Sequence, residues 1–199
     1  MKKDPFIWID KGLITTQQSN QIIKRFEDDK VNQYQGTVGM NNGENATFNV
    51  DLSLKNSKDL FISMHPNWED MQNLFRSIVQ KTVLKYINFL NEYYNLISFT
   101  TGSKYFIQPQ ERLGDAGFFI QKTSPGQGFT WHNDYTTGRL LTFILYLNTV
   151  EEGWTQFANG EQVAPELGKI LIFPATWNYL HQGYPPKQTK YIMTGWLYE

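Results

Sequence analysis

The second half of the chain is built from short β-prone runs, and this pattern constrains the fold more than any other feature. From about residue 103, runs rich in β-branched and aromatic side chains alternate with Gly, Pro and Asn turns. The runs are 103–108, 116–123, 129–134, 140–148, 155–158, 169–173, 178–182 and 190–198. Because one or two short strands are not stable alone, the runs must pair with one another. They predict an antiparallel sandwich or barrel.

The first half of the chain predicts two helices. Thr15 or Thr16 can cap a helix over 17–30, in which apolar residues recur at helical spacing. Pro66 opens a longer run, through Glu92, with a broad apolar face. The Asn- and Gly-rich stretch 34–46 between them predicts a mobile loop, followed by a strand over 46–52.

No repeat, low-complexity linker or boundary divides the sequence. With 199 residues, we expect a single domain over 1–199. Residues 1–100 would supply helical support and an edge strand, and residues 101–199 would form a β core that contains the functional site. The fold class expected is therefore mainly β with supporting α.

Composition excludes several classes of function. The net charge is −1 and 19% of residues are charged, which favours neither a nucleic-acid surface nor an anionic membrane surface. The absence of cysteine excludes disulfides, thiolate metal sites and cysteine nucleophiles. We find neither a signal peptide nor an apolar stretch of ~20 residues, and expect a cytoplasmic protein.

The triplet His132-Asn133-Asp134 and the later His181 predict a metal site. Residues at i and i+2 of a strand share a face, so His132 and Asp134 can bind one ion, and His181 can join them from another strand. Two imidazoles and one carboxylate leave open positions, as in non-haem Fe(II) oxygenases. Zinc stays an alternative, although a zinc hydrolase needs a general base that nothing nearby provides. The third histidine, His65, stands at a helix start, where we expect a capping or surface role.

From about Gly117 to Glu199 the sequence resembles the Fe(II)/2-oxoglutarate dioxygenases of the prolyl 4-hydroxylase type. The resemblance depends on several segments in the same order: Phe129-Thr130-Trp131-His132-Asn133-Asp134, Arg139-Leu140-Leu141-Thr142, Tyr146-Leu147-Asn148, Gly168-Lys169-Ile170-Leu171-Ile172-Phe173-Pro174, and His181 to Trp196. It implies a double-stranded β-helix (a jelly-roll, cupin-like core) packed against the N-terminal helices. It also implies a small microbial or phage-like member of the family.

By position, the resemblance assigns a role to each candidate residue. His132, Asp134 and His181 would be the iron ligands. Lys190 would bind the C5 carboxylate of 2-oxoglutarate, with Lys187, in a probable turn, as the competing cation. Further candidates are Trp196 beside the cosubstrate, and Arg139, which is either near a peptide substrate or a surface residue at a strand start.

Three positions depart from the family pattern. Thr123 stands where the family has a tyrosine that touches 2-oxoglutarate, nine residues before His132. Glu152-Gly153-Trp154-Thr155 replaces a Gly-Gly-Glu-Thr segment and puts a large aromatic near the rim. Tyr198 stands where characterised prolyl hydroxylases can have a substrate-contacting histidine.

The resemblance implies a prolyl 4-hydroxylase-like enzyme that acts on a proline-containing peptide or protein and decarboxylates 2-oxoglutarate to succinate. Fe(II), 2-oxoglutarate and O2 would take part, with ascorbate as a further candidate cofactor. The alternatives are an oxygenase of a free amino acid, another side chain or a small metabolite, and a cupin-like binding module without turnover. We expect no nucleic-acid or membrane partner, and host cytoplasm if the protein is phage-encoded. The 34–46 stretch is either a lid over a peptide or a surface loop.

Overall fold

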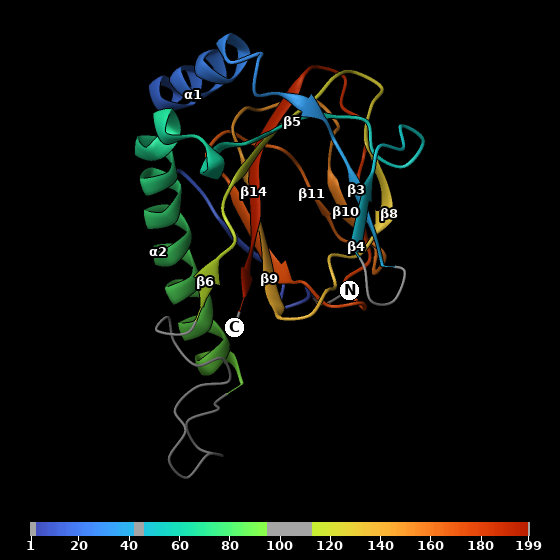
Figure 1. Cartoon of the computed structure of the whole chain (residues 1–199). Coiled ribbons are helices and arrows are strands. Elements are labelled where there is room, and N and C mark those ends of the chain that lie inside the picture. The colour runs from blue at the N-terminus through green and yellow to red at the C-terminus, as the bar shows by residue number, and fades with distance from the viewer. Residues whose placement is uncertain (1–2, 42–45, 95–112, 199) are drawn as a thin grey trace.

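A computed structural model describes residues 3–41, 46–94 and 113–198, and within these ranges most strands belong to two antiparallel sheets (Figure 1). The larger, eight-stranded sheet has the order β1-β12-β9-β14-β7-β5-β2, with β6 pairing to β14. Its strands are β1 (Trp8–Asp10), β12 (Ile170–Pro174), β9 (Arg139–Tyr146), β14 (Lys190–Tyr198), β7 (Phe119–Thr123), β5 (Lys58–Phe61), β2 (Tyr34–Gln35) and β6 (Gly114–Asp115). Strands from both halves of the sequence therefore meet in one sheet.

The smaller sheet has four strands in the order β11-β10-β13-β8 among the described residues. They are β11 (Gln162–Val163), β10 (Thr155–Phe157), β13 (His181–Gly183) and β8 (Phe129–His132). A hairpin of β3 (Val38–Asn41) and β4 (Ala46–Asn49) forms a third sheet of its own. Residues of both main sheets and of the hairpin line a common cavity.

Two helices cover the face of the large sheet that points away from this cavity (Figure 1). They are α1 (Thr16–Asp28) and α2 (Glu69–Tyr93), and two short 3-10 turns, η1 (Ile62–Met64) and η2 (Pro66–Trp68), precede α2. A capping box at Thr15 and Gln18 opens α1, since each side chain bonds the other residue's backbone N–H. Both predicted helices are confirmed, except that 66–68 form the 3-10 turn η2.

Strand β14 shows how the alternation of side chains separates the core from the cavity. Lys190, Ile192, Thr194 and Trp196 line the cavity, whereas Met193 belongs to the core beneath the helices. A register shift between Leu197 and Tyr198 interrupts this alternation. Tyr198, which the sequence pattern places on the same wall, is therefore not among the residues that line the cavity.

The prediction for residues 34–52 was wrong in part. The stretch 34–46 is not a loop throughout, because it contains β2, β3 and the first residue of β4, and the strand ends at Asn49. Sequence patterns missed β1, β2, β3, β5, β6 and β11, whose two to four residues are too short to show periodicity. The predicted strand 103–108 lies outside the described residues. The mainly-β prediction with supporting helices is confirmed.

No helix in the described ranges combines the length and the apolar character that a membrane span requires.

Candidate metal centre

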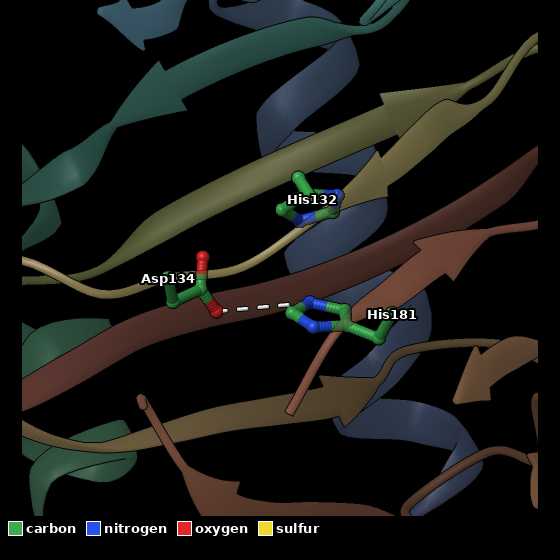
Figure 2. Close-up of side chains that lie close together, drawn as sticks. All are labelled: His132, Asp134 and His181. Atoms are coloured by element: carbon green, nitrogen blue, oxygen red, sulfur yellow. Dashed lines mark ion pairs between the residues drawn. The ribbon is translucent and has the colours of Figure 1, made fainter. Parts of the chain in front are cut away.

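The side chains of His132 and Asp134 converge with that of His181, which lies far along the sequence (Figure 2), and all three line the cavity. His132 ends β8 and His181 begins β13, and these two residues face each other in the antiparallel register. Asp134 follows two residues after His132, and its Oδ2 lies 3.7 Å from Nε2 of His181. One ligand atom from each residue lies within 4.8 Å of the others, which is close enough for a common ion. Within the described residues, His65 does not join this cluster.

Backbone carbonyls orient both imidazole rings. Nδ1 of His132 lies 2.7 Å from the carbonyl oxygen of Thr130, and Nδ1 of His181 lies 2.9 Å from that of Tyr179. A carbonyl oxygen can only accept, so each Nδ1 carries a proton, and Nε2 is the ring nitrogen left to face a metal. This is the arrangement in which histidines usually bind metals.

The protein around the cluster also sets the protonation states of His132 and Asp134. Burial, helped by the nearby His181, lowers the pKa of His132 to about 3, so the imidazole is neutral at physiological pH. Burial alone would raise the pKa of Asp134. Electrostatic interactions with His181 and His132 and hydrogen bonding from Thr142 outweigh burial, and hold the pKa of Asp134 below its usual value. The centre thus offers a neutral imidazole at His132 and a carboxylate at Asp134.

Residues on β9 and β14 hold Asp134 in place. Oγ1 of Thr142 donates a 2.7 Å hydrogen bond to Oδ2 of Asp134. The indole N–H of Trp196 has no partner at hydrogen-bond geometry among the described residues, yet it contributes to lowering the pKa of Asp134. Trp196 therefore lies beside the candidate metal ligand Asp134.

Arg139 is fixed at the edge of the same site. Its guanidinium carbon lies 3.8 Å from the centre of the Trp196 ring, and its Nη1 donates to the carbonyl oxygen of Asp134 at 3.2 Å. Its Nε donates to the hydroxyl of Tyr198 at 2.7 Å. Arg139 lines the cavity, so of its two interpretations the structure favours a position where a substrate can reach it. Tyr198 orients Arg139 instead of lining the cavity itself.

The cavity has a volume of about 700 Å³, and Lys190 lies buried in its wall. Its Nζ donates to the carbonyl oxygen of Gly153 at 2.8 Å, and among the described residues no carboxylate pairs with it. Burial lowers the pKa of Lys190 to about 8. A buried ammonium without an acidic partner is costly, so this position suits an anionic ligand.

Hydroxyl groups accompany Lys190 in the cavity. Thr123 is its register partner on β7, so the short side chain that departs from the family pattern stands next to the ammonium. Tyr146 and Thr155, which the sequence analysis missed, also line the cavity and hydrogen-bond to each other at 2.7 Å. The signal for Tyr146 was its even spacing from Thr142 on β9, which places both on the cavity face.

Two predicted neighbours of the site lie elsewhere. Lys187 is exposed, pairs with Glu151 at 2.7 Å and with Glu152 at 3.2 Å, and does not line the cavity. Trp154 does not line the cavity and packs against Tyr184, with ring centres 4.9 Å apart.

Comparison with known proteins agrees with this geometry. The family model for the 2OG-Fe(II) oxygenase superfamily matches residues 118–198, which include all three candidate metal ligands and Lys190. No curated protein sequence matches the chain.

Several solved structures share the fold at low sequence identity. A prolyl hydroxylase from Trichoplax adhaerens, in complex with a hypoxia-inducible-factor peptide fragment, has a TM-score of 0.65 at 17% identity, covering 98% of this chain and 84% of its own. A Pseudomonas putida prolyl-4-hydroxylase has a TM-score of 0.61 at 14% identity, covering 98% and 93%. The viral collagen prolyl hydroxylase from Paramecium bursaria Chlorella virus-1, in its 2OG complex, has a TM-score of 0.56 at 15% identity, covering 97% and 95%.

Over residues 118–198 the chain thus matches the 2OG-Fe(II) oxygenase superfamily, and the His132–Asp134–His181 cluster provides the two imidazoles and one carboxylate typical of Fe(II) oxygenases. The chain shares the double-stranded β-helix fold of the prolyl hydroxylases named above.

Proposed function

We propose that the enzyme hydroxylates a prolyl residue in a peptide or protein and converts 2-oxoglutarate to succinate and carbon dioxide in the same turnover. One observation carries this proposal: a single cavity contains the His132–Asp134–His181 cluster, the buried Lys190 and an open aromatic rim. At this rim Phe48, Trp131 and Tyr135 are 69%, 44% and 58% exposed. Exposed aromatic side chains beside a cavity suit an extended peptide. The three solved structures named above are prolyl hydroxylases, and they support the choice of residue.

The residues present fit both the metal and the cosubstrate. His132, Asp134 and His181 would hold Fe(II) through two Nε2 atoms and one carboxylate oxygen, the donor set of this class of oxygenases. When bound, the iron supplies the activation of O2 that couples 2-oxoglutarate decarboxylation to oxidation of a C–H bond. Thr142 and the two backbone carbonyls fix the ligands before the metal arrives, which lowers the cost of ordering them.

Lys190 would bind the C5 carboxylate of 2-oxoglutarate. It is a buried cation in the same cavity as the metal cluster, and it has one backbone partner and no acidic one among the described residues. A carboxylate there would satisfy its charge, and the hydroxyls of Thr123, Tyr146 and Thr155 could donate further hydrogen bonds. We assign Thr123 to this contact in place of the tyrosine usual in the family, and Arg139 to the substrate side of the cavity.

The depressed pKa of Lys190 predicts how cosubstrate binding depends on pH. The pKa is about 8 in the empty cavity, and a bound carboxylate favours the ammonium and raises it. Below pH 8 the lysine is already charged, so affinity for 2-oxoglutarate should be constant. Above pH 8 binding must include proton uptake, so Kd should rise about tenfold per pH unit. Calorimetry between pH 7 and 9.5, with Mn(II) in place of iron, measures this; a flat Kd would contradict the assignment.

The identity of the substrate can be tested by mass spectrometry. The purified enzyme with Fe(II) and 2-oxoglutarate is incubated separately with proline-containing peptides, with the same peptides carrying alanine for proline, and with free proline. We expect the mass of one added oxygen only on the proline-containing peptides. Oxygen added to free proline, or to the alanine peptides, would replace the proposal with a small-molecule substrate or another side chain.

A further inference from the structure

Strand β8, which carries His132, is held on both edges. One edge pairs with β13, and the other is hydrogen-bonded to the segment Leu54–Asn56. The N–H of Thr130 donates to the carbonyl oxygen of Leu54 at 2.8 Å, and the N–H of Asn56 donates to that of Gly128 at 2.9 Å. Residues 54–56 lie outside the segment that matches the oxygenase family, so part of the support of the metal centre comes from the other half of the chain.

A buried ion pair fastens this segment to the large sheet. Nζ of Lys55 lies 2.6 Å from Oδ2 of Asp59 on β5, and the two side chains are only 8% and 3% exposed. Asp59 also accepts from Ser57 at 2.7 Å and from Gln121 on β7 at 3.1 Å. The carboxylate is thus fully engaged, and the position of Lys55 is fixed by strands of the large sheet.

The same lysine adjoins the aromatic ring that rests on His132. Phe129 and His132 stack with ring centres 3.5 Å apart and planes 12° apart. Nζ of Lys55 lies 5.4 Å from the centre of the Phe129 ring, and the two residues form an isolated backbone bridge. The Phe129 ring and the carbonyl of Thr130 therefore limit how far the His132 imidazole can turn.

We propose that the Lys55–Asp59 ion pair is a positioning device for the metal ligand His132. Through the Leu54–Asn56 segment and Phe129 it fixes the strand and the ring plane that present Nε2 to the metal. This inference rests on the proposed function only in taking His132 as a ligand. An apolar pair of similar size could fill the same space, but only the directional ion pair fixes the segment relative to both sheets.

Metal affinity of a double variant tests the proposal. Lys55→Met alone would leave Asp59 as an unpaired buried charge, so Lys55→Met/Asp59→Asn removes both charges and keeps the volume. We expect Co(II), titrated in place of iron, to bind this variant about tenfold more weakly, with an altered visible spectrum, while thermal unfolding of the apoprotein changes little. The single variant Lys55→Arg, in which Asp59 is intact and the ion pair is preserved, should keep the Co(II) affinity and the visible spectrum of the wild type.

Lys122→Met is the matched control. Lys122 lies on β7 next to Gln121 and pairs with Glu27 at 2.7 Å, at the α1 side of the sheet. Its loss should leave Co(II) affinity unchanged. A stable double variant with wild-type Co(II) affinity and spectrum would overturn the positioning role and leave the proposed function intact. A wild-type protein that fails to bind Co(II) would overturn both.

Discussion

The His132→Ala variant is expected to lose all conversion of 2-oxoglutarate to succinate, with or without a substrate present. The substitution removes one of three metal ligands and the ring that stacks on Phe129. Loss of the hydrogen-bond partner of a metal ligand typically lowers activity or metal affinity by roughly 10–100-fold. We expect loss of the ligand itself to lower activity by more than roughly 100-fold. Succinate formation under saturating Fe(II) and 2-oxoglutarate measures the effect.

The chain provides a matched control, because it has only three histidines. His65 lies between η1 and η2, away from the cavity, and His65→Ala should retain wild-type turnover. If His132→Ala keeps substantial turnover, or if the two variants lose it equally, the proposed metal centre is wrong.

The second large effect is expected from Lys190→Met. The methionine keeps most of the volume and removes the charge that we pair with the C5 carboxylate of 2-oxoglutarate. Removing one partner of a buried, hydrogen-bonded charge pair costs about 2–5 kcal/mol, so the KM for 2-oxoglutarate should rise at least roughly 30-fold. Turnover assays over a range of 2-oxoglutarate concentrations measure this.

Lys187→Met separates this effect from a general loss of positive charge. Lys187 pairs with Glu151 and Glu152 on the surface, where a single pair contributes little. Its KM for 2-oxoglutarate should stay within about twofold of wild type, because exposed pairs contribute less than ~1 kcal/mol. If the KM for 2-oxoglutarate rises more in Lys187→Met than in Lys190→Met, the lysine that binds the cosubstrate is Lys187.

The metal cluster could be predicted because its geometry depends on simple rules. The sequence predicts a strand over 129–134, in which the i, i+2 spacing places His132 and Asp134 on one face. The observed strand β8 ends at His132, and Asp134, two residues past its end, still joins the cluster. The approach of His181 needed one further assumption, an antiparallel β core, which the short runs after residue 103 justified. The structure shows the two histidines in direct register.

The buried pair Lys55 and Asp59 could not be predicted, because burial is not visible in single charged residues. Lys55 and Asp59 belong to a chain with 18 basic and 19 acidic residues, and most such side chains are solvated. Their burial depends on the pairing of β5 with β7 and of Leu54–Asn56 with β8. Tyr198 is absent from the cavity lining for another reason: a register shift between Leu197 and Tyr198 ends the alternation of side chains along β14.

The hairpin β3–β4 borders the cavity, yet it is not part of either main sheet. It ends at Asn49, before the segment that supports His132 begins at Leu54. We therefore expect strands β3 and β4 to be exchangeable without disturbing the two sheets that carry the candidate metal ligands. Grafting a different hairpin there offers a way to alter which molecules the enzyme accepts while its chelating groups stay untouched.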